Sequence, residues 1–519
     1  MSRRGFLATA AAATLAACTE SSPATPMSSA TAATSTTTPP TTGPPDLSAL
    51  STQIKGRLLR PNDAGYAAAA QVYNPRFDSA APLAVAQVAS ADDVAAALGF
   101  AKANKVPLAL RAGSHCYPGW SAGGAPGTGV PPSLVIDVAG LNTVSVDKAL
   151  GVEGHAARIG AGTLLIDAYR QLAAAGVGIP AGSCPSVGIT GLTLGGGIGV
   201  LSRAWGLTCD ALTAVQIVTA DGVVRSVDRQ HDPDLFWACQ GGGGGQFGVV
   251  TQLTFATRPA PRITTFYLEW SWSAAATVLD AWQQWMAQAD PQLWSTLKLL
   301  VSGGHTVVRL AGTWLGTTAE LDSVLDRLAS AVGAAPSTRS TQDHSYLDAM
   351  LLEASCTKVG ATQCYLAPKG ALQREALSAT SHLGTHPLDS ATIGVVTAQV
   401  EKALTVSGVV EAGVSFDALG GEVSTVANAD SAFGYRDALF SLQYTATYTD
   451  TARADTYDAY VRGFRAAMLP HLGNTAYVNY ADAAIEAPQQ AYFTANAARL
   501  GQIKKRYDPD GLFTQPQSF

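Results

Sequence analysis

The sequence predicts an α+β protein of two domains, and two patterns and the chain length carry that prediction. Short strand and helix signals alternate through residues 46–259, whereas residues 260–470 hold longer alternating strands separated by amphipathic helices. The chain has 519 residues, 47% of them hydrophobic, which is long for one core and suits two. We therefore place a domain boundary near residue 259.

The first 17 residues are predicted to be an export signal. Residues 2–7 read SRRGFL, a twin-arginine signal, and the apolar run behind them is too short to span a bilayer. Residues 15–18 read LAAC and resemble a bacterial lipobox, in which Cys18 would carry lipid. Two outcomes stay open, a lipoprotein anchored at the cell surface and a freely secreted protein.

The composition of the remaining chain limits its partners. Residues 18–45 are rich in Ser, Thr, Pro and Ala and bury too little surface to order, so we expect a disordered tether. Only 14% of the residues are charged and the net charge is −6. We therefore expect neither a nucleic-acid partner nor a polybasic membrane surface.

The first domain begins with a strand, a helix and a second strand. Residues 84–88 are apolar and read as a strand, Ser90 caps a helix over residues 94–104, and residues 106–110 form the next strand. Residues 206–222 add an alternating strand that ends in an Asp-Gly turn. This alternation predicts a mixed sheet covered by helices.

Residues 180–210 contain glycine at a density that neither a helix nor a strand interior favours. Glycine costs backbone entropy and offers no side chain to pack, yet eight glycines occur here. Backbone that must closely approach a ligand, as in loops that cradle phosphates, needs this composition. A glycine-rich packed loop without a ligand is the alternative. We expect a cofactor that contains a pyrophosphate.

A second part of the expected site lies upstream, in residues 111–121, which read RAGSHCYPGWS. These residues follow an apolar run of strand character, so a strand leads into a turn. The pattern R-x-G-x-H, followed over residues 182–199 by G-x-C-P-x-V-G-x-x-G-x-x-x-G-G-G-x-G, resembles the FAD-linked oxidases of the vanillyl-alcohol oxidase or PCMH type. Within that family the two motifs are similar to the berberine-bridge-enzyme-like branch.

The resemblance implies a PCMH-type FAD-binding domain and FAD held by two covalent links. His115 would bond the 8α-methyl group of the isoalloxazine and Cys184 its C6 carbon. Taken alone, a hydrogen-bonding histidine and a small buried cysteine are ordinary alternatives. Cys116 is a rival thiol beside His115, and Ala112 stands where the family commonly has glycine or serine. The resemblance places the other FAD contacts at Arg111, Ala112, Gly113, Ser114, Ser121, Val187, Gly188, Gly191, Gly196, Gly197, Asp210, Gly248, Val249 and Asn479.

Residues 241–248 contain a G-x-G-x-x-G pattern that could be mistaken for a nicotinamide site. That fingerprint needs a helix behind it, but residues 249–255, VVTQLTF, are β-branched and alternating, which predicts a strand. We therefore reject a nicotinamide site. The resemblance instead makes this run a later FAD-contacting segment.

The second domain is predicted to be an antiparallel sheet backed by helices that binds the substrate. Its expected strands are residues 263–272, 297–301, 307–314, 408–418 and 439–447, and its clearest helices are residues 274–289 and 320–332. Six tryptophans lie in it, most of them expected in the core and one or two open to lining a groove for a sugar or polyphenol ring. These are Trp270, Trp272, Trp282, Trp285, Trp294 and Trp314.

Residues 471–519 are similar to the closing segment of the same family, in which a Y-x-N-Y strand reaches over the flavin. On that match Asn479 contacts the flavin and Tyr480 is the base that takes a proton from the substrate. An ordinary aromatic strand with a surface polar residue is the alternative. Asp482 would lie on the same strand face as Tyr480, where it could orient the tyrosine.

The remaining cysteines and histidines indicate neither a disulfide framework nor a metal site. Cys356 and Cys364 are the only closely spaced pair among Cys116, Cys209, Cys239, Cys356 and Cys364, and no spacing resembles a zinc site. His382 and His386 are four residues apart, but Gly384 and Pro387 argue against a helix that would present them together. We predict no metal.

The resemblance implies an exported oxidase that passes a hydride from an alcohol, sugar or hemiacetal carbon to flavin and then reduces O2 to H2O2. In this family a valine three residues after the linking cysteine goes with oxygen access, and Val187 stands there. Two alternatives stay open. One is a dehydrogenase or tailoring enzyme of secondary metabolism with another acceptor, and the other is a non-catalytic surface binding protein.

Overall fold

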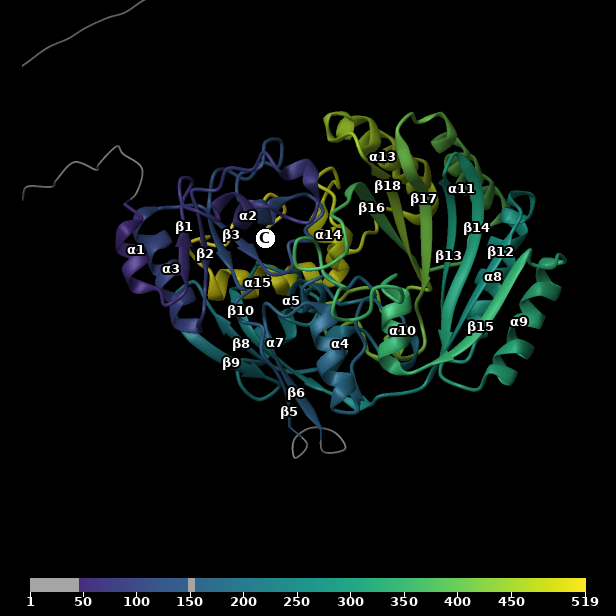
Figure 1. The fold of residues 1–519 in the computed structure, drawn as a ribbon, viewed down its shortest axis with the longest axis horizontal. Coiled ribbons are helices and arrows are strands. Elements are labelled where there is room, and N and C mark those ends of the chain that lie inside the picture. Colours follow the sequence, from purple (N-terminus) through teal and green to yellow (C-terminus); the bar gives the residue numbers. More distant parts are fainter. Residues whose placement is uncertain (1–45, 148–154) are drawn as a thin grey trace, which may run out of the picture. The chain divides into compact units, whose positions relative to one another are not determined.

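The described chain, residues 46–147 and 155–519 of this computed structural model, begins with a small mixed sheet (Figure 1). Its elements are β1 (Arg57–Leu59), β2 (Ala84–Gln87), α3 (Ala91–Asn104), β3 (Leu108–Arg111) and β4 (Leu134–Asp137). The strand order is β1-β2-β4-β3, and β2 and β3 both run parallel to β4. As predicted, Ser90 caps α3: its hydroxyl accepts a hydrogen bond from the backbone N–H of Asp93.

A second sheet, antiparallel throughout, completes the first part of the chain. It contains β5 (Val144–Asp147), β6 (Ala156–Gly160), β8 (Leu212–Val218), β9 (Val224–Asp228) and β10 (Val249–Ala256), in the order β5-β6-β10-β8-β9. A strand, β10, therefore follows the G-x-G-x-x-G run, as predicted. Smaller elements are α1 (Ser48–Gln53), α2 (Tyr66–Ala70), α4 (Leu165–Ala174), α5 (Ile189–Leu194), α6 (Ser202–Trp205), α7 (Pro233–Ala238) and the strand pair β7 (Val177–Gly178) and β11 (Arg258–Pro259).

A seven-stranded antiparallel sheet follows. Its strands are β12 (Ile263–Trp270), β13 (Leu293–Ser302), β14 (His305–Trp314), β15 (Thr338–His344), β16 (Ala376–Gly384), β17 (Val409–Ala418) and β18 (Phe440–Tyr448). The order is β15-β12-β14-β13-β17-β18-β16. The five predicted strands are present, and β15 and β16 are additional. β15 is a mostly exposed edge strand without apolar alternation, so its sequence gives little strand signal.

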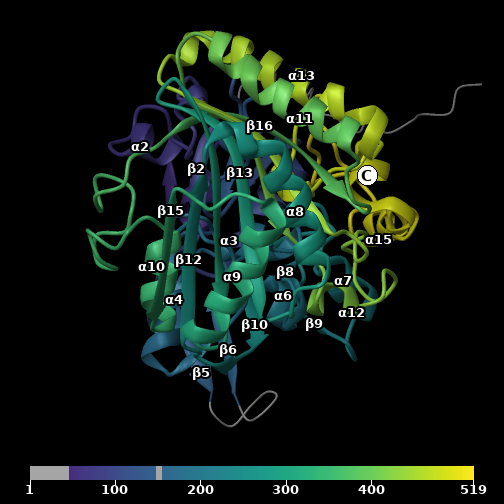
Figure 2. The same ribbon diagram turned by 90° about the vertical axis from the view of Figure 1, so that its right-hand side faces the viewer.

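Helices cover one face of this sheet (Figure 2). They are α8 (Ala275–Ala287), α9 (Thr318–Val332), α11 (Ser390–Lys402) and α13 (Ala454–Leu472), while α10 (Tyr346–Glu353) and α12 (Glu422–Thr425) lie in the connections. Trp282 of α8 is fully buried and packs edge-on against Phe416 of β17 and tilted against Phe440 of β18. The strand faces that carry Phe416 and Phe440 are therefore the apolar faces, and they pack against α8.

The opposite face of the sheet is polar, because side chains alternate between the two faces of a strand. The strand register places Thr296, Asp417 and Ser441 in one row across β13, β17 and β18. Gln443 lies two residues further along β18, and its side-chain amide donates a hydrogen bond to the hydroxyl of Tyr117 at 2.6 Å. The polar face is therefore turned toward the first part of the chain.

The last residues return to the first part, where the C-terminal α14 (Pro488–Phe493) and α15 (Ala497–Tyr507) lie among the earliest elements (Figure 1). The Lys504 ammonium donates to the carbonyl of Gln246 at 2.8 Å. The predicted Y-x-N-Y strand is wrong: residues Val478–Tyr480 form a short 3-10 turn. The backbone N–H of Tyr480 turns back to the carbonyl of Tyr477 at 2.9 Å, which closes the turn.

Contacts unite the described residues, 46–147 and 155–519, in one compact unit. The domain boundaries expected at residues 259 and 470 lie inside this unit, and they stay a prediction. The export signal, the tether and Cys18 lie outside the described residues. In the described part of the chain, no helix is long and apolar enough to cross a membrane.

Cys356 and Cys364 form a disulfide, with 5.6 Å between their Cα atoms. The bonded pair is fully buried and packs with Ile166, Leu351 and Tyr365. Their short separation made them the only closely spaced pair in the sequence. Cys116, Cys184, Cys209 and Cys239 are free thiols.

Candidate active site

A cavity of about 320 Å³ collects residues from four segments that lie far apart in the sequence. The segments surround residues 111–121, 184–194, 243–250 and 478–481, with further residues from 492–517. Most of the predicted site residues line this one cavity. They are Arg111, Ala112, Gly113, Ser114, His115, Ser121, Cys184, Val187, Gly188, Gly191, Gly248, Val249, Asn479 and Tyr480.

Two of the segments cross with their backbones in contact. A Cβ atom on Gly113 would lie 2.0 Å from the backbone nitrogen of Gly188, and a Cβ on Gly188 would lie 2.4 Å from that of Gly113. Because backbone atoms cannot give way as a flexible side chain can, only glycine fits at both positions. This crossing brings the turn that carries His115 next to the segment that carries Cys184.

His115 is held at one ring nitrogen and on one ring face. Its Nε2 atom lies 2.9 Å from the hydroxyl oxygen of Ser186, and the Tyr73 ring stacks on the imidazole at a centroid distance of 3.9 Å and an angle of 21°. Burial lowers the pKa of His115 to about 3. The imidazole is therefore neutral at physiological pH, with a free lone pair on one nitrogen.

Cys184 opens into the same cavity. Desolvation by the surrounding protein is the main cause that raises the pKa of its thiol. The Lys298 ammonium opposes that effect, and Glu375 adds to it. The rival thiol, Cys116, also lines the cavity and is partly buried, and burial raises its pKa as well. Both thiols therefore line the predicted site, as the sequence analysis allowed.

Tyr480 lines the cavity and lies among aromatic rings. Its ring is parallel to that of Tyr117 at 5.8 Å and edge-on to that of Tyr477 at 4.9 Å. Burial is the main cause that raises the pKa of Tyr480 well above its usual range, and among charged groups Asp417 contributes most. The phenol is therefore neutral near pH 7, and it must lose its own proton before or as it accepts another.

Three comparisons place the chain among known proteins. Family models match residues 82–228 (FAD binding domain) and residues 476–519 (berberine and berberine like). The uncharacterized FAD-linked oxidoreductase YvdP of Bacillus subtilis (strain 168) is 34% identical over 472 residues, 90% of this chain and 98% of that protein.

The chain belongs to the berberine-bridge-enzyme-like family of FAD-linked oxidoreductases.

Two further relatives agree with that membership. The glucooligosaccharide oxidase of Sarocladium strictum is 27% identical over 460 residues, 83% of this chain and 86% of that protein. The solved structure of Physcomitrella patens BBE-like 1 has a TM-score of 0.82 at 28% identity and covers 91% of this chain and 98% of that one. The predicted family, the α+β fold, FAD as cofactor and FAD-linked oxidoreductase activity are confirmed.

The cavity of this berberine-bridge-enzyme-like protein fits FAD. Four buried polar atoms of the lining residues have no hydrogen-bond partner among the described residues, and a polar ligand would satisfy them. They are Arg111 Nη1, Trp120 Nε1, Ser121 Oγ and Gln246 Oε1. Arg111 keeps one nitrogen 3.0 Å from the carboxylate of Asp137, which fixes the guanidinium and leaves the other nitrogen for an anion.

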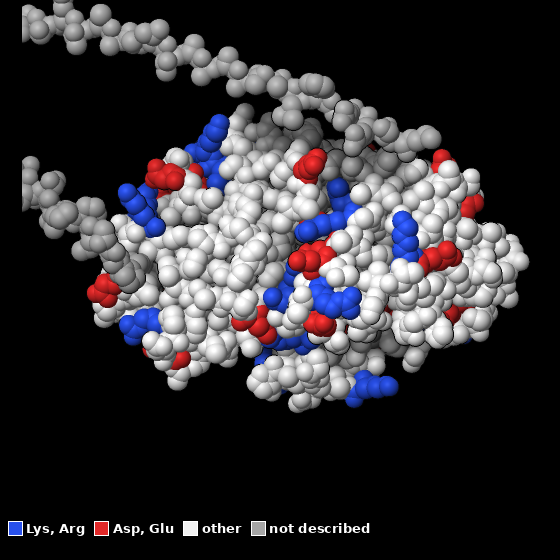
Figure 3. Space-filling model, turned by 90° about the horizontal axis from the view of Figure 1, so that it is seen from above, with Lys and Arg blue, Asp and Glu red and all other residues white. Residues whose placement is uncertain are grey.

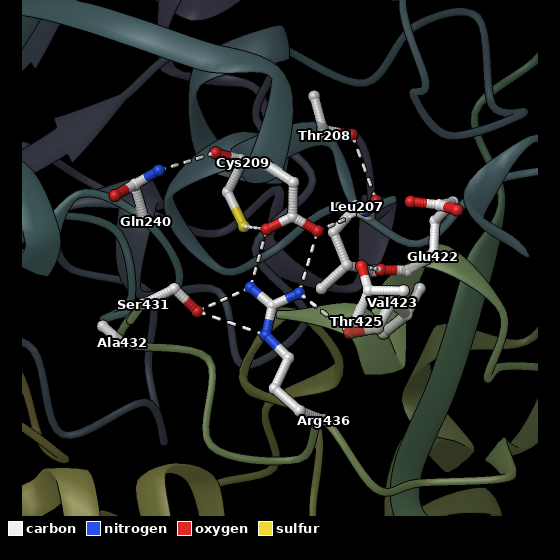
Figure 4. A network of polar contacts seen from close by, with 12 residues as sticks. Leu207, Thr208, Cys209, Gln240, Glu422, Val423, Thr425, Ser431, Ala432 and Arg436 are labelled. Carbon is white, nitrogen blue, oxygen red and sulfur yellow. Dashed lines mark hydrogen bonds and ion pairs between the residues drawn. The ribbon is translucent and has the colours of Figure 1, made fainter. Parts of the chain in front are cut away.

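Three predicted FAD contacts lie outside the cavity lining. The Asp210 carboxylate accepts two hydrogen bonds from the Arg436 guanidinium, at 2.7 and 2.8 Å, in a largely buried network (Figure 4). Gly196 abuts Phe433, and the N–H of Gly197 donates to the Tyr477 hydroxyl at 2.8 Å. These three residues therefore support the glycine segment through contacts with other parts of the protein, away from the cavity lining.

Asp482 does not orient Tyr480, and that expectation is wrong. Its carboxylate binds the Arg462 guanidinium at 2.8 Å and accepts the backbone N–H of Ala484 at 3.0 Å. The reason is the turn at Val478–Tyr480, since residues two apart share a face only in a strand.

Asn479 holds the glycine segment, and its contact with the flavin stays a prediction. It lines the cavity, and its amide donates to the carbonyl of Leu192 and to the hydroxyl of Tyr477, both at 2.9 Å. A Cβ on Gly195 would lie 2.0 Å from the Asn479 side-chain oxygen, so that glycine makes room for the amide.

The sequence analysis missed the residues that surround the reactive groups. Ser186 and Tyr117 stand inside the quoted motifs and could have been found there, whereas Asp417, Gln443 and Tyr73 have no local signal. The six tryptophans do not line the cavity: four are buried, and Trp272 and Trp285 pack partly buried on the core. His382 is buried and bonds Tyr444, and no cluster in the described residues could hold a metal.

Proposed function

We propose that the protein oxidises a hydroxyl-bearing carbon of a sugar or similar alcohol, with FAD linked to His115 and Cys184 and with O2 as the acceptor. The single observation that supports this most is that His115, Cys184 and Tyr480, from three distant segments, meet in one cavity. The oligosaccharide oxidase among the relatives favours a carbohydrate, and the proposal extends that substrate class to this chain.

In this proposal, side chains of the protein transfer the proton of the substrate hydroxyl. Bound FAD supplies the hydride acceptor. A neutral phenol with a raised pKa is a poor base alone, so the substrate hydroxyl proton moves to Tyr480 as the phenol proton leaves toward a carboxylate. Asp417 has the strongest charge effect on Tyr480, and burial raises the pKa of this carboxyl, which makes the carboxylate a better proton acceptor. The substrate loses one proton and one hydride and becomes a carbonyl compound.

Oxygen is the proposed final acceptor, giving H2O2. Val187 lines the cavity three residues after Cys184, at the position that the resemblance associates with oxygen access. If a dehydrogenase were present instead, the reduced protein would be reoxidised by a dye but slowly by air. This comparison under aerobic and anaerobic conditions separates the two.

The proposed location is outside the cytoplasm, reached through the twin-arginine machinery and kept at the surface by lipid on Cys18. Seen from above, the described protein has acidic and basic side chains mixed on a mostly uncharged face, which supports a small-molecule substrate and no nucleic acid (Figure 3). Fractionation of cells that make the protein or its Cys18→Ala variant tests the anchor, because only the former should stay with membranes.

Acid precipitation of the purified protein tests the links. We expect yellow colour in the pellet, one remaining link in His115→Ala or Cys184→Ala, and release of the flavin in the double variant. A panel of oligosaccharides and simple alcohols is then assayed for peroxide. Colour in the supernatant of the unaltered protein would contradict covalent attachment.

A further inference from the structure

We propose that Ser186 and Tyr73 are positioning residues that hold the His115 imidazole for its attachment to FAD. The inference rests on the proposed histidyl link and concerns how this chain forms it. Two contacts carry it, the 2.9 Å approach of Ser186 Oγ to His115 Nε2 and the 3.9 Å stack of Tyr73 on the imidazole. Neither residue is among the FAD contacts that the sequence predicts.

Ser186 decides which ring nitrogen is free. A neutral imidazole has one N–H and one lone pair, and the hydrogen bond at one nitrogen sets which is which. When Nε2–H donates to the Ser186 oxygen, Nδ1 keeps its lone pair and becomes the nucleophile. Ser186 is 5% exposed, so water competes little for this bond.

The Ser186 hydroxyl can also form a hydrogen bond with His115 after the link has formed. In the linking step the Nδ1–C bond forms, one C–H bond of the 8α-methyl group and the N–H bond of the ring break, and two electrons and two protons pass to O2 as H2O2. Nε2 then has a lone pair instead of a hydrogen. A hydroxyl both accepts and donates, so Ser186 can bond Nε2 before and after the step.

Tyr73 fixes the ring plane, and the second half of the chain fixes Tyr73. Its hydroxyl donates to the carboxylate of Glu375 at 3.2 Å, and burial together with this carboxylate raises the pKa of the phenol, which keeps it protonated. Arg374 donates to the carbonyl of Val72 at 2.9 Å and pairs with Asp78. Residues 374–375 directly precede β16 of the seven-stranded sheet, so the holder of His115 is complete only when that sheet has docked.

The experiment isolates the histidyl link. In a protein that carries both Cys184→Ala and Cys116→Ala, His115 is the one candidate link that remains, and Ser186 is then kept, changed to Ala or changed to Thr. Protein from a flavin-depleted host is mixed with FAD in air. The mass of the denatured chain follows attachment, while the colour of the native protein reports bound flavin.

We expect the Ser186→Ala variant to bind flavin but to link it at least about tenfold more slowly, because small losses of orientation cost that much or more. Ser186→Thr should link at the parent rate, since its hydroxyl remains. In a His115→Ala background the same Ser186→Ala change should leave the Cys184 link unaffected. A purely structural role would slow both links alike.

Three outcomes would overturn the inference. The first is attachment at the parent rate in Ser186→Ala, and the second is an equal loss of both links. The third is a Cys184→Ala protein that binds flavin yet never links it, which also removes the histidyl link from the proposed function. A loss of the linking rate in Ser186→Ala alone leaves the proposed function intact.

A second pair of variants decides the matter if Ser186→Ala no longer binds flavin. Tyr73→Phe keeps the stack on His115 and loses the bond to Glu375, whereas Tyr73→Leu loses both. We expect slow linking in Tyr73→Leu and a smaller effect in Tyr73→Phe. Equal, parent-like rates in both would overturn the role of the stack and, with it, the proposed holder.

Discussion

The two sides of the active site are built from different parts of the polypeptide. On the cofactor side, backbones meet: Gly113 and Gly188 leave no room for a Cβ, and the site is made of turns. On the polar sheet face, defined as Thr296, Lys298, Asp417, Ser441 and Gln443, the site is made of side chains on a regular frame. The crossing therefore tolerates no side chain at Gly113 or Gly188, whereas the sheet face can change its chemistry one side chain at a time.

The largest expected effect comes from adding a side chain to the backbone crossing. Gly113→Val should abolish flavin binding and lower stability by about 3 kcal/mol, because its Cβ would overlap the backbone of Gly188. Flavin absorbance and denaturant unfolding measure both. Gly99→Ala in α3 is the matched control, since its Cβ would meet open space. Flavin retained in Gly113→Val would break the contrast between the two sides.

Removal of one oxygen from Tyr480 should come next. Tyr480→Phe keeps the ring against Tyr117 and Tyr477 but cannot move a proton, so the rate of flavin reduction should fall about 10²- to 10⁴-fold. Flavin content and the covalent links should not change. Anaerobic stopped-flow reduction by substrate gives the rate, and a decrease of less than threefold would exclude Tyr480 from the proton path.

A change on the sheet face should affect chemistry without affecting the cofactor. Asp417→Asn removes the carboxylate proposed to receive the Tyr480 proton, and we expect reduction to slow about tenfold, or roughly 1.4 kcal/mol. The flavin spectrum and the fraction linked should match the unaltered protein. Ser415→Ala, on the same strand face, is the control and should leave the rate unchanged. Equal effects of the two would contradict a proton-accepting role.

An effect of similar size, but on stability and dependent on pH, is expected at Glu353. Burial, its main cause, raises the pKa of this carboxyl to about 7 from an ordinary value of 4.5. Between these values the folded state holds more protons than the unfolded state, so stability falls as pH rises through this window. Glu353→Gln should therefore be more stable than the parent by about 1–2 kcal/mol at pH 8 and equal at pH 4.5. Unfolding curves with equal differences at both pH values would refute this.

The same contrast explains what could be predicted from the sequence. The cofactor side is local: Arg111, His115, Cys184 and Gly188 stand in short motifs whose glycines can be recognised without a structure. Asp417 and Gln443 are single polar residues in alternating strands, and only the register of β17 and β18 brings them toward Tyr480 and Tyr117. No local pattern encodes that register.

One wrong prediction and one partner that the sequence did not reveal both have long-range causes. The run of aromatic residues around Asn479 has strand composition, but the Tyr477 hydroxyl binds the N–H groups of Gly197 and Ile198, and this buried contact favours a turn. Asp210 ends the glycine segment, and its contact with FAD stays a prediction. Its carboxylate accepts hydrogen bonds from Arg436, more than 200 residues later, which no local pattern indicates. In both cases a long-range contact decided the local structure.

The return of the C-terminal segment has a consequence for biosynthesis. Tyr480, Gln515 and Gln517 all line the cavity. While the ribosome is still adding these residues, the FAD site has no closing side. Domains often fold from the N-terminus as they emerge, but this site cannot be finished that way. Loading with FAD must therefore wait until translation of these last residues is over, and a nascent chain halted before residue 476 should emerge without its flavin.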